Sequence, residues 1–159
     1  MRRLLPTIAV VMALGAPILG RDLTVPDISG TWVLNLTKSK LAKGTNVHSE
    51  TVVITSSESN IVMHFNTDGN ESTHAYIADG KERVFAKVQG GEDLVKAYWK
   101  KSTLVIETFA RLKMPNMPAV DGSEAWHLKA RWTLSGDGRV LTDEVEGFDA
   151  KTVSVYDKQ

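Results

Sequence analysis

Apolar and polar side chains alternate over short stretches of this chain, as they do in a β-strand that buries one face. The stretches 30–37 and 124–134 show the alternation most plainly. In the first of them, Trp32, Leu34 and Leu36 share one face, and polar residues stand between them. Similar runs of β-branched and aromatic residues continue to the end of the chain. The ten strands that we predict cover residues 30–37, 50–56, 60–66, 72–78, 82–88, 93–100, 103–110, 124–134, 139–146 and 151–157.

Segments rich in Gly, Asp and Asn separate these strands. Asp-Gly and Gly-Gly supply the positive φ angles that tight hairpins need. The clearest turns are Thr67-Asp68-Gly69-Asn70, Ala78-Asp79-Gly80-Lys81, Gln89-Gly90-Gly91-Glu92 and Ser135-Gly136-Asp137-Gly138. A sheet of ten short sequential strands has two edges to protect, and closing on itself removes both. We therefore predict an all-β fold, an antiparallel up-and-down meander closed into a barrel of about 8 to 10 strands.

Two longer links, at 38–49 and 111–123, keep a second architecture open. A two-sheet sandwich with Greek-key crossings needs one or two connections of this length. Either link could also cover the mouth of a barrel, although ordinary surface loops would have the same composition.

The first twenty residues have the composition of an export signal. Arg2 and Arg3 precede an apolar stretch that runs from Leu4 to Leu19 and ends among small residues. Pro6 and Pro17 interrupt this stretch, and it is shorter than the roughly 20 apolar residues that span a bilayer. We expect the signal to be cleaved and the protein to be periplasmic or secreted. The expected organisation is a signal peptide at 1–20, a leader at 21–28 and a barrel domain at 29–159.

The composition of the remaining chain limits its partners and its chemistry. The 159 residues include no cysteine, which excludes disulfides, thiolate metal sites and a lipoprotein anchor. Without Arg2 and Arg3, 17 basic side chains face 19 acidic ones, with the signs interspersed. Nucleic acids and acidic membranes select basic patches, so we expect neither as a partner, and no stable membrane anchor after cleavage. The oligomeric state cannot be deduced from this pattern.

The segment Ser29-Gly30-Thr31-Trp32-Val33-Leu34-Asn35, with Lys38-Ser39-Lys40 after it, suggests a family. A Gly-x-Trp sequence that opens the first strand of such a meander resembles the start of lipocalins and other members of the calycin superfamily. Further likeness, at 103–108 and 131–138, is to small secreted lipocalin-like proteins of environmental bacteria. The resemblance implies that Gly30 and Trp32 form a structural plug at the closed end of the barrel. It also implies a basic residue over the indole, for which Arg131, Arg139 and Lys151 are the candidates.

In such a barrel the interior can hold one small ligand among apolar and aromatic side chains. We therefore predict a hydrophobic ligand, with a solid-cored envelope protein that acts through protein contacts as the alternative. The large side chains that could contact a ligand are Phe65, Tyr76, Trp99, Phe109, Met114, Trp126 and Trp132. The same side chains could instead fill the barrel as its core.

The chain has no sequence signature of catalysis, and we predict neither a catalytic site nor a cofactor or metal. An enzyme would need His74 or His127 inside the barrel beside an acid. His64 and His74 lie on neighbouring predicted strands and could approach each other, although no pair of histidines has the spacing of a local metal motif. We expect Glu144 and Glu146 on one face, turned outward to solvent.

Overall fold

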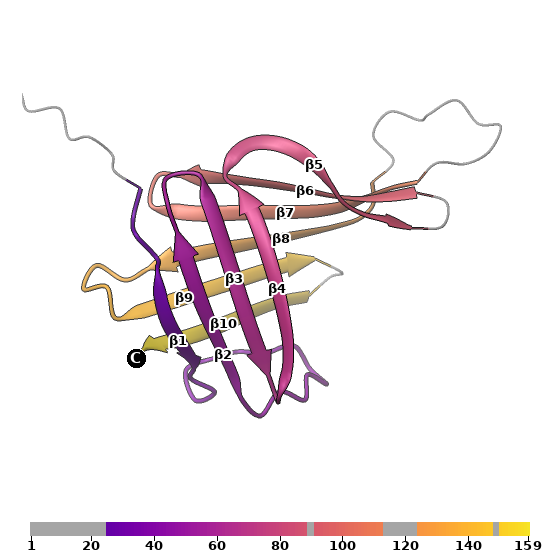
Figure 1. The fold of residues 1–159 in the computed structure, drawn as a ribbon. Coiled ribbons are helices and arrows are strands. Elements are labelled where there is room, and N and C mark those ends of the chain that lie inside the picture. The colour runs from indigo at the N-terminus through magenta and orange to yellow at the C-terminus, as the bar shows by residue number, and fades with distance from the viewer. Residues whose placement is uncertain (1–24, 89–90, 113–123, 148–149) are drawn as a thin grey trace, which may run out of the picture.

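The computed structural model describes residues 25–88, 91–112, 124–147 and 150–159, and ten antiparallel strands organise this part of the chain (Figure 1). The strands are β1 (Gly30–Leu34), β2 (Glu50–Ser56), β3 (Asn60–Thr67), β4 (Asn70–Ile77), β5 (Asp79–Val88), β6 (Gly91–Lys100), β7 (Thr103–Leu112), β8 (Glu124–Leu134), β9 (Val140–Gly147) and β10 (Ala150–Lys158). These bounds confirm the predicted strands to within about three residues. The first strand is shorter than predicted, because β1 ends at Leu34, and Leu36, which was expected on the buried face of Trp32, lies beyond it and is 44% exposed. No helix in the described residues is long and apolar enough to cross a membrane. The predicted signal peptide and the first half of the leader, residues 21–24, lie outside the described residues.

All ten strands belong to one sheet, in the order β4-β3-β2-β1-β10-β9-β8-β7-β6-β5. Consecutive strands are paired with each other except for β4 and β5, and one non-consecutive pair, β1 with β10, joins the two halves of the sheet. The longer link at 38–49 joins paired strands, and so does the link between β7 and β8. The fold is therefore the predicted meander barrel, and the sandwich alternative is wrong.

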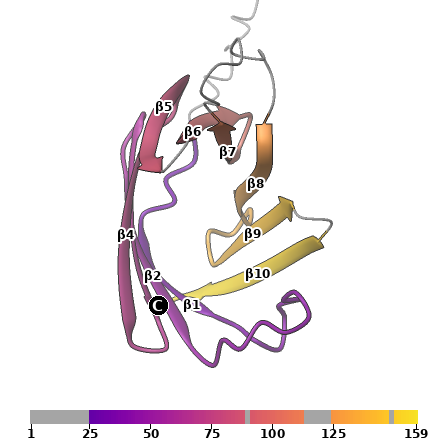
Figure 2. The ribbon, with the colours of Figure 1, turned by 90° about the vertical axis from the view of Figure 1, so that its right-hand side faces the viewer.

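Closure of the barrel is not complete, because β4 and β5 are the two edges of the sheet. Their chain connection is the single residue Ala78. Figure 2 shows the wall formed by β1–β4 facing the wall formed by β7–β10 across the interior. Near the start of β5 its pairing with β6 shifts register between Asp79 and Glu82. The register shifts again between Val84 and Ala86. Such bulges bend a strand and increase its twist, so β5 turns away from β4 and leaves a seam.

Inward-facing side chains fill most of the space between the two walls. Alternate residues along each strand belong to one buried cluster, and the cross-strand register aligns them from strand to strand. The fully buried members include Ile61, Met63, Leu104 and Leu141. Because the chain has no cysteine, the burial of this apolar cluster is the main stabilising term that the fold has.

Trp32 lies fully buried where β1 runs beside β2 and β10. Its indole N–H donates a hydrogen bond of 3.0 Å to the carbonyl oxygen of Ile28, so the polar edge of the ring is satisfied. The ammonium of Lys158 lies 5.1 Å from the ring centroid. The basic residue over the indole is thus Lys158, and not Arg131, Arg139 or Lys151 as the resemblance led us to expect.

Candidate functional site

A pocket of about 330 Å³ opens at the seam between β4 and β5. Its floor includes three residues of the buried core, Ile61, Val95 and Ala97, so the pocket reaches through the edge of the sheet to the interior. Lys81 and Arg83 stand on the β5 side of the pocket. The remaining lining residues are Asn60, Val62, Ala75, Tyr76 and Ile77. Ligand sites in proteins commonly begin at about this volume and are lined mainly by apolar groups.

The two cationic side chains of the seam pocket, Lys81 and Arg83, differ in how accessible they are to a ligand. Arg83 donates hydrogen bonds of 2.7 and 2.8 Å to the two carboxylate oxygens of Asp79, and this pairing holds the pKa of Asp79 well below its usual range. The Lys81 side chain is exposed. Lys81 is therefore the cation of the pocket that is most accessible to a negatively charged group.

Aromatic rings cross the interior from the seam to the opposite wall. His74 of β4 stacks on Phe85 of β5 with 5.9 Å between ring centroids, and Phe65 of β3 packs edge-on against His74 at 5.8 Å. The ring of Phe65 also lies beside Trp132 of β8, with 6.2 Å between ring centroids. Trp132 stacks on Tyr156 of β10, with 5.8 Å between ring centroids. These contacts join the β3–β4 wall to β8 and β10 across the interior.

A polar group lies among these apolar contacts. The hydroxyl of Tyr156 donates a hydrogen bond of 2.6 Å to Oε1 of Glu50, and the hydroxyl of Thr67 donates one of 2.5 Å to Oε2. Burial, followed by the negative charge of Glu50, raises the pKa of Tyr156 far above its usual range. Tyr156 therefore remains a neutral donor, and both oxygens of Glu50 are already used as acceptors.

Asp143 of β9 lies on the same inward face as this group. The ladders pair it with Trp132 on one side and Ser154 on the other. It is 9% exposed, and its Oδ1 atom has no hydrogen-bond partner within the described part of the chain. Burial raises the pKa of Asp143 to about 8, and the negative charges of Glu50 and Glu144 add to this effect. Ionising a buried carboxyl without a donor beside it is costly, so Asp143 keeps its proton at neutral pH.

Tyr76 connects the seam pocket with Asp143. It lines the pocket, and it packs against the buried core from β4. Burial raises the pKa of Tyr76 to about 12, and the charge of Asp143 contributes to the rise. The two side chains are thus close enough for their charges to interact, although they come from strands on opposite walls of the barrel.

The structure brings together four of the seven predicted ligand-contact residues. Phe65, Tyr76, Trp99 and Trp132 all pack in or against the interior cluster. Nε1 of Trp99 is buried without a hydrogen-bond partner in the described part of the chain. Met114 and the side chain of Trp126 lie outside the described residues.

Phe109 was expected to face the interior, but it lies on the other face of the sheet. It alternates with Leu104 and Ile106, which face inward, and it pairs with Leu94 across the ladder. Its ring packs edge-on against His127, with 6.3 Å between centroids. Phe109 is buried there, so it stabilises the outer side of β6–β8 and does not face the space that a barrel ligand would occupy.

The histidines on the two neighbouring strands β3 and β4 do not share a face, and only His74 of the two turns toward the interior. His64 and His74 point to opposite faces of β3 and β4, because His64 pairs with Thr73 while His74 pairs with Met63. His127 shares the outer face with Phe109. In the residues that the structure describes, no group of three or more His, Asp or Glu side chains could hold a metal ion.

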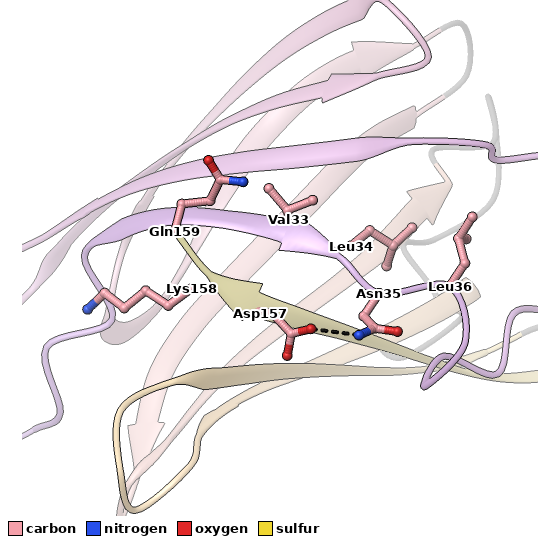
Figure 3. Close-up of a pocket in the computed structure, with 7 residues that line it drawn as sticks. All are labelled: Val33, Leu34, Asn35, Leu36, Asp157, Lys158 and Gln159. Atoms are coloured by element: carbon pink, nitrogen blue, oxygen red, sulfur yellow. Dashed lines mark hydrogen bonds between the residues drawn. The ribbon is translucent and has the colours of Figure 1, made fainter.

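A second hollow, of about 430 Å³, lies on the surface where β1 meets β10 (Figure 3). It is lined by Val33, Leu34, Asn35, Leu36, Asp157, Lys158 and Gln159. The polar groups here already bind each other, since Nδ2 of Asn35 donates to Asp157 at 2.6 Å and Lys38 forms an ion pair with it at 2.9 Å. The seam pocket reaches the core and this hollow does not, so we take the seam pocket as the candidate site.

Comparison with solved structures identifies the architecture. A protein described as the REP1-NXSQ fatty acid transporter superposes with a TM-score of 0.57 at 11% identity, over 83% of this chain and 96% of its own. The fold is that of the fatty-acid-binding barrels. Fatty-acid-binding protein 1 of Echinococcus granulosus superposes with a TM-score of 0.57 at 13% identity, over 82% of this chain and 96% of its own. An apo lipid-binding protein of Caenorhabditis elegans superposes with a TM-score of 0.56 at 10% identity, over 82% of this chain and 94% of its own. No protein-family model matches the sequence, and no curated protein matches it.

The residues of the polar group, Glu50 and Asp143, were not among those that we predicted from the sequence. A signal for Asp143 was present, because Leu141, Asp143 and Val145 alternate with polar residues and so place the aspartate on an apolar face. Its neighbours Glu144 and Glu146 do lie on the opposite face. There they form ion pairs with Lys151 at 2.8 Å and with Arg131 at 2.9 Å, respectively.

Proposed function

We propose that this protein binds a small hydrophobic molecule, which reaches the barrel interior through the seam between β4 and β5. The observation that carries the proposal is the seam pocket of about 330 Å³, whose lining includes three residues of the buried core. The similar solved structures, which are described as fatty acid and lipid-binding proteins, support the same class of function. The signal-like N-terminus supports the further proposal that the protein acts after export, in the periplasm or outside the cell.

The residues around the seam pocket indicate which contacts this ligand would make. Phe65 and Trp132 join the two walls beyond the pocket, with 6.2 Å between ring centroids. Val95 and Ala97 of β6, together with Tyr76 of β4, would contact its apolar part. Burying that part is the main source of affinity.

A fluorescent apolar probe titrated into the purified domain tests the proposal. Ala97→Leu places a larger side chain on the pocket floor, and we expect it to weaken probe binding by about tenfold or more, a free-energy change of about 1.4 kcal/mol. Ala150→Leu adds the same atoms to an exposed position at the start of β10 and should leave binding unchanged. Thermal melting would show that both variants are folded.

If the folded domain binds neither the probe nor a panel of fatty acids, the ligand-binding proposal is wrong. A protein that acts through surface contacts would then be the better account. Val84 and Phe85, each 49% exposed on the edge strand β5, would be the first side chains to substitute in that case.

A further inference from the structure

The rim of the seam pocket carries a positive charge that nothing beside it neutralises. Lys81 and Arg83 of β5 are the charged members of the ten described residues that line the pocket, and none of the ten is an acid. Arg83 is paired with Asp79 through both carboxylate oxygens, so these two charges cancel. Lys81 is exposed, and its ammonium forms no ion pair within the described part of the chain. The rim therefore offers one free cation to a ligand.

The barrel interior offers a negative charge no comparable partner. Among the described residues, no buried side chain is a lysine or an arginine. The polar group inside consists of Glu50, whose oxygens accept hydrogen bonds from Tyr156 and Thr67, and of Asp143, which keeps its proton at neutral pH. A buried charge without a counter-charge is costly in an apolar environment. An anionic head group is thus destabilised inside the barrel and stabilised at the rim.

The seam pocket connects these two environments. Val95 and Ala97 of β6, which belong to the buried core cluster, line it together with Lys81. Tyr76 and Ile77 of β4 line its other side. An alkyl chain can therefore lie on the apolar floor while the head group that it carries stays beside Lys81. Because that head group remains in solvent, the walls of the barrel do not limit its size.

We propose that the ligand is a single-chain amphiphile whose anionic head group is held outside the barrel by Lys81, at the rim of the seam, while its chain enters tail first. The inference deepens the proposed function and rests on it. A bulky phosphodiester head group fits this arrangement as well as a small carboxylate does, so lysophospholipids belong to the range of ligands. The charge of the head group, and not its size, determines the affinity.

Calorimetry with three probes below their micelle concentrations tests the inference. Laurate and lauroyl lysophosphatidylglycerol each carry one negative charge, lauroyl lysophosphatidylcholine carries no net charge, and all three share one acyl chain. We expect the two anions to bind with affinities within about threefold of each other. The zwitterion should bind about three- to tenfold more weakly, the effect of one partly exposed ion pair. If laurate binds and lysophosphatidylglycerol does not, the head group is enclosed and the inference is overturned.

Substitution of Lys81 provides the second test. Lys81→Gln should weaken both anions by about three- to tenfold and leave the zwitterion within about twofold, and Lys81→Arg should restore the anions. Lys43→Gln is the matched control, because it removes an exposed lysine of the link at 38–49 that does not line the pocket. Added salt should weaken the binding of lysophosphatidylglycerol to wild type more than to Lys81→Gln. Unchanged anion affinity in a folded Lys81→Gln protein would overturn the inference.

The outcomes also separate the two proposals. If all three probes bind equally and Ala97→Leu weakens them while Lys81→Gln does not, the ligand-binding function stands and the inference fails. If none of the three binds, and the apolar fluorescent probe does not bind either, the proposed function fails and the inference fails with it.

Discussion

The side chain of Lys158 crosses over Trp32, and Gly30 leaves the space for it. The ammonium of Lys158 is 5.1 Å from the indole centroid, and a Cβ atom at Gly30 would stand 3.1 Å from Cε of the lysine. The ladder pairs Trp32 directly with Lys158, so the two ends of the β-sheet region meet at this contact. The Gly-x-Trp motif is therefore explained by this contact: Trp32 supplies the ring, Lys158 covers it, and Gly30 leaves room for the lysine.

Replacing Lys158 tests the energetic contribution of this contact. Lys158→Met keeps an unbranched apolar stem but loses the charge, and we expect a loss of about 0.5–1 kcal/mol in the free energy of unfolding. Lys158→Arg keeps a cation over the ring and should remain close to wild type. Urea denaturation of the three proteins provides the measurement. If Lys158→Met is as stable as wild type, the stem, and not the charge, stabilises Trp32.

Gly30→Ala should destabilise the barrel more strongly. Gly30 has a φ of 141°, a conformation that side chains rarely adopt, and the added methyl group would also press on Lys158. We expect a loss of about 1–3 kcal/mol, measured by the same denaturation. Gly136→Ala is the matched control, because φ there is not positive and nothing lies within 4 Å of the added atom. A comparable loss in both variants would contradict the explanation.

The stability of the protein should depend on pH through Asp143. Its pKa is about 8 in the folded state against an ordinary value of 3.8, so between these values the folded state binds the extra proton. The free energy of unfolding therefore falls as the pH rises from about 4 to about 8, by up to roughly 1.4 kcal/mol per pH unit.

Asp143→Asn removes this dependence while keeping the shape of the side chain. Urea denaturation at pH 5 and pH 8 should show that wild type loses more stability across the interval than the variant does. The other carboxyls contribute equally to the pH dependence of both proteins, so their effect cancels in the difference. Glu107, whose pKa is lowered beside Lys129, is one of them. Parallel pH profiles would show that Asp143 is ionised throughout.

The N-terminal segment is expected to direct export and then to be removed. Expression of the full sequence in a host with a secretory pathway should give a protein outside the cytoplasm whose mass lacks about the first twenty residues. Mass spectrometry of the purified protein locates the cleaved bond. Deleting residues 2–20 should retain the protein in the cytoplasm, and export of that variant would disprove the assignment.

The strands could be predicted from the sequence because turn residues and alternation are local signals. Thr67-Asp68-Gly69-Asn70 is an example, since Asp68 and Gly69 both adopt positive φ in the hairpin between β3 and β4. Phe109 was misplaced for a local reason as well. Thr103, Glu107 and Arg111 share the face of Phe109 and indicate the outward side, but the apolar run from Leu104 to Ile106 obscures the alternation.

The seam and the partner of Trp32 depend on longer-range relationships. The register shifts of β5 against β6 turn β5 away from β4, and the sequence around Val84 gives no sign of them. Lys158 reaches Trp32 only because β10 pairs with β1 in one particular register. Asp143 could have been placed inward by alternation, but its lack of a partner follows from the packing of Glu50 and Tyr156 across the barrel.

The position of the seam also determines how the chain can fold. Strands β1–β4 and β5–β10 are two successive meanders, each made of neighbouring hairpins. Among the described strands, the ladder between β1 and β10 is the one that joins the two meanders within the sheet. That ladder aligns only three residue pairs and must close the longest loop in the molecule. We expect the two meanders to form early and their association through β1 and β10 to limit the folding rate.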